Sequence, residues 1–171
     1  GVSGSDRIIL VGFNRRFAPM AKRVKEWFSP REWPLLLTAR INAGRLEEGS
    51  WLLDPEEGGG RIVGEVCHFI DLFQYWTDAR VARVSVEALR SKTGHPPAEE
   101  NIQVLLGFSD GSSASLAYTS EGAVGVPKEY YEIHGGERSA TIGDWKRLVL
   151  TQGNRDKAIR STRQDKGHAG E

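Results

Sequence analysis

The strongest constraint on the fold is a series of short apolar segments in the second half of the chain, each bounded by turn residues. Segments that are apolar at strand length, or that alternate with polar residues, are typical of β-strands. They cover residues 81–89, 101–108, 112–118, 130–134, 139–142 and 147–150. Asp110-Gly111 stands between two of them and is a strong hairpin signal. Because hairpins join antiparallel neighbours, the sequence predicts an antiparallel meander here.

Helical patterns are confined to the first half of the chain. Pro19 opens one helix, whose apolar residues return at helical spacing until Ser29-Pro30. The strongest helical pattern runs from about residue 61 to residue 76. Residues 7–13 and 34–42 are predicted as strands, and residues 43–60 as a long polar loop. This order indicates an α+β fold, with a mostly antiparallel open sheet and helices on one face.

Composition and charge argue against several classes of protein. The chain carries 23 Lys plus Arg and 23 Asp plus Glu, so no basic excess points to nucleic acid. No apolar stretch approaches the roughly 20 residues of a membrane-spanning helix. Cys67 is the only cysteine, which excludes an intramolecular disulfide and favours the cytoplasm. We expect no metal site, because the sequence has no Cys/His cluster at ligand spacing.

The 171 residues suit a single domain, which we place at residues 7–171. Residues 1–5 could be left from cloning. The polar tail from Thr151 has too few apolar residues to fold alone, and its last seven residues are similar to a helix cut short near its start.

The segment from Gly58 to Asp71 resembles the helix of the C-terminal domain in the glucose–fructose oxidoreductase / inositol dehydrogenase (Gfo/Idh/MocA) family. Residues 11–19, 127–135 and 165–168 are similar to three further parts of that domain, in the same order. The resemblance implies the dihydrodipicolinate-reductase-like C-terminal half of a two-domain dehydrogenase. It also implies a sugar, cyclitol or related polyol as substrate and NAD or NADP as cofactor.

The dinucleotide-binding half of such an enzyme is missing from the sequence. Family enzymes begin with a Rossmann domain, whose G-x-G-x-x-G turn presents backbone amides to the pyrophosphate. Val11-Gly12-Phe13-Asn14 is not such a turn. We therefore expect a separate N-terminal Rossmann domain to be the partner that mainly binds the cofactor. The isolated chain, which we interpret as truncated at or near its final helix, is predicted to be inactive.

The resemblance places His68 at the active site of the parent enzyme. A neutral imidazole can accept the proton that an alcohol loses when it is oxidised by hydride transfer. The alternative is a structural histidine bonded to a carboxylate. At 100° per residue, His68 shares a polar stripe with Arg61, Gly64, Asp71 and Tyr75, directed away from the core.

Many family members carry an aspartate where this chain has Gly64. Two interpretations follow: Glu65 supplies the missing acid as a catalytic residue, or Gly64 leaves space for a bulkier substrate. A solvated or salt-bridged Glu65 is the alternative to a catalytic one. Asp71 either orients the imidazole or bonds a neighbouring loop.

Four further residues are candidates for binding. Trp51 and Asp54 lie in the long loop, where an indole and a carboxylate can hold a sugar ring; a Trp51 that covers the core is the alternative. The family resemblance suggests that Lys128 lines the interdomain cleft and that Arg16 contacts the cofactor. A solvated lysine and a structural ion pair are the alternatives.

The sequence leaves three functions open. The chain is either the substrate half of an oxidoreductase, a non-catalytic ligand-binding or assembly module, or a relative that uses NAD in glycoside cleavage. We also predict a homo-oligomer through the uncovered sheet face, because exposed apolar patches mark partner surfaces. The residues assigned to that face are Val84, Val86, Leu105, Leu116 and Tyr118.

Overall fold

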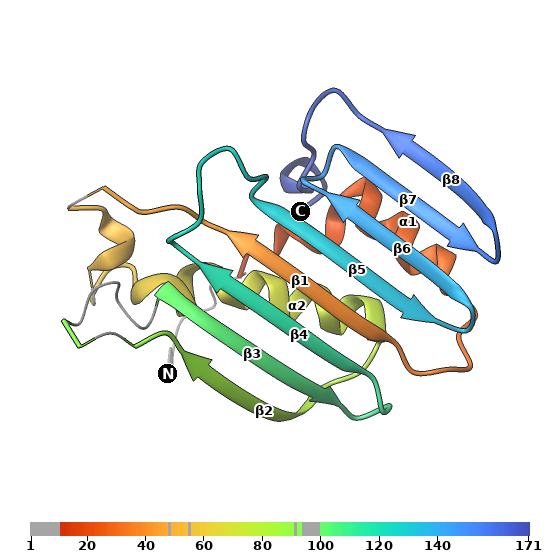
Figure 1. Ribbon diagram of the computed structural model, residues 1–171, viewed down its shortest axis with the longest axis horizontal. Coiled ribbons are helices and arrows are strands. Elements are labelled where there is room, and N and C mark those ends of the chain that lie inside the picture. The colour runs from red at the N-terminus through yellow and green to blue at the C-terminus, as the bar shows by residue number, and fades with distance from the viewer. Residues whose placement is uncertain (1–10, 48, 55, 91, 94–99) are drawn as a thin grey trace, which may run out of the picture.

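The computed structural model describes the chain apart from residues 1–10, 48, 55, 91 and 94–99 and the side chain of residue 53. The described residues form an eight-stranded sheet in the order β2-β3-β4-β1-β5-β6-β7-β8 (Figure 1). The strands are β1 Leu36–Asn42, β2 Val81–Ala88, β3 Asn101–Phe108, β4 Ser113–Thr119, β5 Glu129–Gly135, β6 Arg138–Gly143, β7 Arg147–Gln152 and β8 Arg155–Arg160. Neighbouring strands are antiparallel except β1 and β4, which are parallel. The predicted α+β fold is confirmed.

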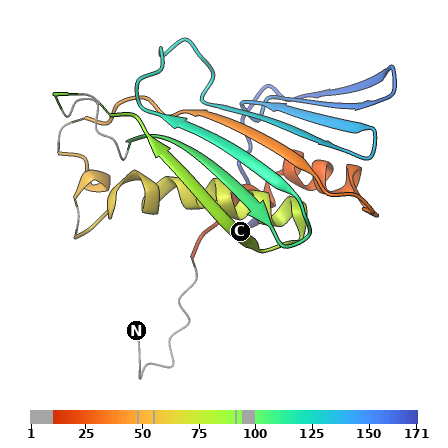
Figure 2. The ribbon, with the colours of Figure 1, turned by 60° about the horizontal axis from the view of Figure 1, so that its bottom comes forward.

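The helices cover one face of this sheet and leave the other face open (Figure 2). They are the 3-10 helix η1 Asn14–Phe17, α1 Pro19–Trp27, the 3-10 helix η2 Trp51–Leu53, the π-helix η3 Ile62–Val66, α2 Cys67–Thr77 and the 3-10 helix η5 His168–Gly170. The long helix predicted at residues 61–76 is therefore an α-helix that begins with a π-helical turn.

The core lies between the sheet and the helices. Alternate residues of each inner strand point into it, as Ala114, Leu116 and Tyr118 of β4 do, and all three are buried. From the helix side, α2 contributes Trp76, which is 2% exposed and whose Nε1 donates to the carbonyl of Ala21 in α1 (3.1 Å). Burial of one large apolar side chain contributes about 1.5–3 kcal/mol, so this layer supplies most of the stability.

Pro19 and Gly111 have the structural roles that the sequence predicts. Pro19 occupies the first turn of α1, where its missing N–H is not needed. Gly111 has φ +88° in the β3–β4 turn, a conformation that costs glycine little, and its N–H donates to the carbonyl of Phe108 (3.1 Å).

Two predictions about the ends of the chain need correction. Of the strand predicted at residues 7–13, residues 7–10 lie outside the described part, and residues 11–13 are irregular before η1. The polar tail does contain a strand, because Arg155–Arg160 pairs with β7 as β8. Backbone pairing to an existing edge needs little apolar content, which is why the prediction missed it.

The residues assigned to the uncovered sheet face also need correction. Leu116 and Tyr118 are each 1% exposed, because they point toward the helices. Val84 and Val86 pair with the core residues Leu106 and Val104, so they point to the helix side of the sheet, beyond the cover of α2. Of the five, only Leu105 lies on the open face. Oligomerisation through that face stays a prediction, with Leu105 as the one residue of the five that remains available for it.

Candidate functional site

The predicted polar stripe of the long helix is wrong at its beginning. The π-helical turn at Ile62–Val66 bonds i to i+5, so the angle of 100° per residue does not hold there. Arg61 consequently points toward the sheet, with a side chain only 1% exposed. Its guanidinium donates to the Tyr118 hydroxyl (2.9 Å) and to the carbonyl of Gly44 (2.7 Å).

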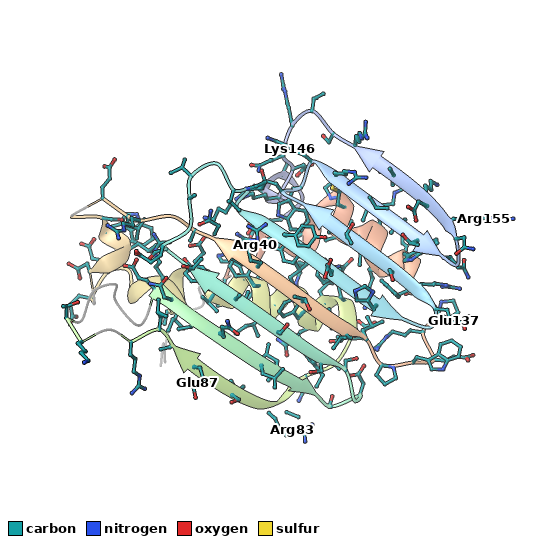
Figure 3. All side chains as sticks on the ribbon, viewed as in Figure 1. Arg40, Arg83, Glu87, Glu137, Lys146 and Arg155 are labelled. Atoms are coloured by element: carbon teal, nitrogen blue, oxygen red, sulfur yellow. The ribbon has the colours of Figure 1, made fainter. Side chains whose placement is uncertain are left out.

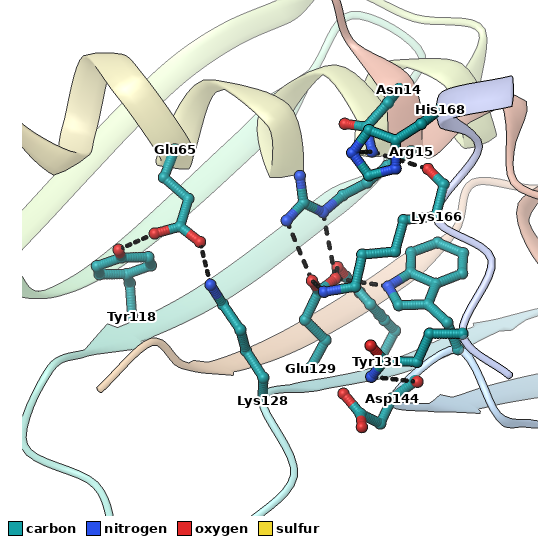
Figure 4. Close-up of polar contacts among 12 residues, drawn as sticks. Asn14, Arg15, Glu65, Tyr118, Lys128, Glu129, Tyr131, Asp144, Lys166 and His168 are labelled. Atoms are coloured by element: carbon teal, nitrogen blue, oxygen red, sulfur yellow. Dashed lines mark hydrogen bonds and ion pairs between the residues drawn. The ribbon is translucent and has the colours of Figure 1, made fainter. Parts of the chain in front are cut away.

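Glu65 follows Arg61 toward the sheet and forms the centre of a polar cluster (Figure 4). Its carboxylate accepts hydrogen bonds from the Tyr118 hydroxyl (2.5 Å) and from Nζ of Lys128 (2.5 Å). Arg61 lies 3.6 Å from the same carboxylate. The Glu65 side chain is 15% exposed and that of Lys128 is 37% exposed, so solvent reaches this cluster. We call these four residues the Glu65 cluster.

The surroundings of Glu65 keep its carboxyl group ionised. Burial would raise the pKa of Glu65, but the hydrogen bonds from Lys128 and Tyr118 and the charges of Lys128 and Arg61 lower it overall. Burial raises the pKa of Tyr118 well above its ordinary value, and its hydrogen bond to Glu65 raises it further. The cluster therefore holds a carboxylate between two cations at neutral pH.

The space beside Gly64 is occupied by the chain itself. A Cβ at Gly64 would lie 2.5 Å from Cδ1 of Leu52, which packs against this turn. The interpretation that Gly64 leaves room for a bulkier substrate stays a prediction, and it requires the Leu52 side chain to move. The other interpretation, that Glu65 replaces the missing acid, stays a prediction.

His68 stands at the beginning of α2, where its ring packs edge-on against the ring of Phe13 at 5.6 Å between centroids. Its Nδ1 is buried and has no hydrogen-bond partner among the described residues. Burial lowers the pKa of His68, and the charge of Arg15 lowers it further, although Glu65 and other nearby carboxylates oppose this. The imidazole is therefore neutral at physiological pH and able to accept a proton.

Asp71 does not orient His68 by any hydrogen bond in the described part of the chain. Its carboxylate instead accepts hydrogen bonds from two guanidinium nitrogens of Arg16, Nε at 2.8 Å and Nη2 at closer range. The Asp71 side chain is 8% exposed. This ion pair joins η1 to α2. It agrees with the alternatives given above, in which Asp71 bonds a neighbouring segment and Arg16 forms a structural ion pair.

The two candidates in the long loop, Trp51 and Asp54, differ in what they contact. Trp51 is 63% exposed, so it does not cover the core, and solvent reaches its indole. Asp54 uses Oδ1 to accept the backbone N–H groups of Glu56 (2.7 Å) and Glu57 (3.2 Å). Asp54 therefore shapes the loop turn, a local role that the loop sequence alone did not reveal.

A second polar cluster, which the sequence analysis missed, surrounds Glu129 at the beginning of β5 (Figure 4). The Glu129 side chain is completely buried. Its carboxylate accepts hydrogen bonds from four residues: Arg15 (3.1 and 3.2 Å), Tyr131 (2.5 Å), Trp145 (2.6 Å) and Lys166 (2.8 Å). We call these five residues the Glu129 cluster.

One signal could have identified Glu129 from the sequence. It alternates with Tyr131 and Ile133 in β5, so an acidic residue occupies a core-facing position of a strand. A buried carboxylate needs cationic or hydrogen-bonding partners. Burial would raise the pKa of Glu129, but Arg15 and Lys166 lower it to about 2. This cluster ties η1 and the tail to the sheet and holds Arg15 near His68.

The described residues do not form a phosphate site for a dinucleotide. Such a site needs a strand, a glycine-rich turn and a helix N-terminus in succession. The glycine run at residues 58–60 instead follows a loop, and a Cβ at Gly58 would lie 2.4 Å from the carbonyl oxygen of Trp51. Arg16, predicted to contact the cofactor, is engaged by Asp71.

The described residues contain neither a metal-binding cluster nor a membrane-spanning helix. No group of three or more His, Cys, Asp or Glu side chains is arranged to hold a metal ion. No helix in the described ranges is both long enough and apolar enough to cross a bilayer.

Residues 33–141 match the family model described as the GFO/IDH/MocA C-terminal domain. The chain belongs to this family. The match covers β1 to most of β6 and includes both Glu65 and His68. A search of curated proteins found no match.

Solved structures share the fold of this GFO/IDH/MocA C-terminal domain at low sequence identity. An inositol dehydrogenase homologue complexed with NAD+ from Azotobacter vinelandii has TM-score 0.71 and 16% identity, over 90% of this chain and 44% of that one. UDP-N-acetylglucosamine 3-dehydrogenase from Acidithiobacillus ferrooxidans has TM-score 0.72 and 20% identity, over 95% and 49%. A super-repressor mutant of Gal80p from Saccharomyces cerevisiae has TM-score 0.71 and 14% identity, over 92% and 47%. The chain thus spans about half the length of these proteins.

Proposed function

We propose that this chain is the substrate-side half of an NAD(P)-dependent oxidoreductase that acts on a sugar, cyclitol or related polyol. The observation that carries the proposal is His68, a partly exposed and neutral imidazole whose ring nitrogens make no hydrogen bond among the described residues. Family membership and the fold shared with dehydrogenases support it. The nicotinamide would accept the hydride and would be held mainly by a Rossmann domain outside this chain. The single cysteine keeps the reducing cytoplasm as the proposed compartment.

His68 would accept the proton of the substrate hydroxyl as that carbon is oxidised. Its lowered pKa keeps the ring in the basic form at neutral pH, so activity should fall at a lower pH than the ordinary pKa of histidine would give. Arg15, fixed by Glu129, favours this neutral form because it adds positive charge nearby.

The Glu65 cluster would bind rather than transfer protons. Glu65 is ionised and already accepts two hydrogen bonds, which leaves it poorly suited to act as a general acid. Lys128 is the more exposed partner and could exchange one of its donors for a substrate hydroxyl. Trp51, in the loop that precedes η3, would supply an apolar platform for the sugar or cyclitol ring of the substrate.

Steady-state kinetics of the full-length protein with His68→Asn test the catalytic role. Asn keeps a hydrogen bond but accepts no proton near neutral pH, so kcat should fall about 10²- to 10⁴-fold while KM changes little. The matched control is His134→Asn, because His134 is exposed on the sheet face and bonds only Ser139 (2.8 Å) among the described residues. A variant at His68 that keeps its turnover and pH profile would leave this histidine without a catalytic role.

A second candidate function is a non-catalytic module for ligand binding or assembly. The observation that favours it is Gly64, which lacks the carboxylate of many family members and whose space is filled by Leu52. The fold shared with a Gal80p mutant is compatible with it. Calorimetric titration of the full-length protein with NAD(H), NADP(H) and polyols, followed by product analysis, separates ligand binding alone from turnover and from glycoside cleavage.

A further inference from the structure

The strand β2 forms a free edge of the sheet with an unusual exposure. It is first in the strand order and pairs with β3 alone among the described strands. Its six central residues are all exposed, on both faces of the sheet. Figure 3 shows Arg83 and Glu87 along this edge. Free edges invite pairing with another strand unless charge or covering elements prevent it.

The backbone groups that β2 offers for pairing can be identified. Leu89 donates its N–H to the carbonyl of Asn101 (2.8 Å), and hydrogen-bonded pairs alternate along an antiparallel ladder. Residues 83, 85 and 87 therefore direct their N–H and C=O groups toward β3. Residues 84, 86 and 88 direct theirs outward, where a further strand would bind.

The side chains of β2 are arranged with two different faces. Arg83, Ser85 and Glu87 lie on the open face, whereas Val84 and Val86 lie on the helix side and are 62% and 49% exposed. Within the described residues, neither Arg83 nor Glu87 has an ion-pair partner. Four residues of a strand span about 13 Å, so these two charges cannot reach one another in the same chain.

We propose that β2 pairs antiparallel with β2 of a second copy of this chain, about a two-fold axis at Ser85. In this register Arg83 stands opposite the partner's Glu87 on the open face, and the contact occurs twice by symmetry. Val84 stands opposite the partner's Val86 on the helix side. Outward backbone groups of residues 84 and 86 then meet one another, so the ladder of each copy continues into one sheet.

The alternation of backbone groups and the charges together select this register. A two-fold axis midway between two residues would place the outward N–H and C=O groups of one copy opposite residues whose groups point toward β3. No hydrogen-bonded ladder would form between the copies. An axis at Val84 would place Arg83 opposite Ser85, and an axis at Val86 would place Glu87 opposite Ser85, so neither register pairs the charges. Opposite charges directly across a ladder stabilise by about 0.2–1 kcal/mol per pair, which is enough to favour one register.

The other edge of the sheet shows how such pairing is prevented. β8 carries three cations, Arg155, Lys157 and Arg160, against one acid, Asp156. Two copies of β8 would bring six cations together with two acids, so net repulsion between the strands opposes their pairing. β2 carries one charge of each sign, spaced for self-pairing. The interface is a single short strand pair and is below the size of stable dimers, so the association should be weak and dependent on concentration.

Analytical ultracentrifugation of the whole chain tests this pairing by charge exchange. Arg83→Glu or Glu87→Arg alone places like charges opposite one another, and each should weaken association at least about tenfold. The double variant Arg83→Glu/Glu87→Arg restores opposite charges and should restore association. Arg155→Glu on β8 is the control and should leave it unchanged. All three positions are exposed, and thermal unfolding of each variant verifies the fold.

Residue-resolved hydrogen exchange gives a second readout that needs no variant. As protein concentration rises, the amides of Val84 and Val86 should gain protection, while those of Ser85 and Glu87, already bonded to β3, should change little. A monomer at millimolar concentration, association that survives both single charge reversals, or protection without this alternation would overturn the proposal. If the copies associate through the open face instead, association should survive both single charge reversals.

Discussion

Glu65 and Glu129 have similar partners in very different surroundings. Each carboxylate accepts a hydrogen bond of 2.5 Å from a tyrosine hydroxyl and another from a lysine ammonium. Glu129 is completely buried and has further donors, whereas Glu65 is 15% exposed and its lysine partner is 37% exposed. The buried cluster is saturated and serves the fold, whereas solvent reaches the partly open cluster, whose lysine we propose as a donor to a ligand. Exposure, rather than residue type, separates the two roles.

Removing the buried carboxylate should have the largest effect on stability. Glu129→Ala leaves the buried Arg15, the half-buried Lys166 and two aromatic donors without their acceptor. Loss of one partner from a buried ion pair costs about 3–5 kcal/mol. Urea unfolding at pH 7 measures the loss. The control is Glu132→Ala in the same strand, on the open face, which should cost less than about 1 kcal/mol. A small loss at Glu129 would contradict its structural role.

Protonation of Glu129 should contribute to unfolding of the protein by acid. Its pKa in the folded chain is about 2, below the ordinary value of 4.5, so the unfolded state binds a proton more readily. The resulting stabilisation, about 3 kcal/mol, is present above pH 4.5 and is lost as the pH falls toward 2. Unfolding free energies measured from pH 6 to pH 2 should show this decline, and Glu129→Gln should flatten it. An unchanged pH slope in the variant would refute the assignment.

Matched tyrosine variants compare the two clusters directly. Tyr131→Phe should cost about 1.5–3 kcal/mol, because a hydrogen bond to a charged and fully buried acceptor is lost. Tyr118→Phe should cost about 1 kcal/mol, because Arg61, 3.6 Å from Glu65, can approach the carboxylate in its place. Chemical denaturation of both variants gives the two values. Equal losses would mean that the Glu65 cluster is as rigid as the buried one.

The smallest effect is expected at the exposed member of the Glu65 cluster. Lys128→Met removes an ion pair that solvent screens, so stability should fall by less than about 1 kcal/mol. Unfolding measurements at low salt and in about 1 M salt check this, because the difference from the natural chain should shrink as salt rises. A large loss that is insensitive to salt would show that Lys128 is a structural residue.

The sheet was predictable because its inner strands alternate buried and exposed residues. β4 shows the pattern plainly, with Ala114, Leu116 and Tyr118 inward and the residues between them half-exposed. β8 lacks it, since four of its six residues are charged and only backbone pairing to β7 holds it. The pattern also gave no reliable face for β2, whose valines point to the helix side of the sheet.

The candidate site was only partly predictable. His68 came from the family resemblance, and the structure adds the unpartnered Nδ1. The angle of 100° per residue misplaced Arg61, because a π-helical turn cannot be recognised from residue spacing. The Glu129 cluster joins Arg15, in η1, to Lys166 near the end of the tail, and no sequence spacing links residues so far apart. Alternation in β5 was its only sequence signal.

The parallel pairing of β1 with β4 has a consequence for how the sheet forms. β2–β4 and β5–β8 are two meanders of sequential hairpins, each built from local contacts. β1 joins them, and its residue Leu36 pairs with Ser113, which is 113 − 36 = 77 positions later in the chain. Closing so long a loop is slow relative to hairpin formation. The two meanders can thus form early, and insertion of β1 between them is the step that makes one cooperative domain.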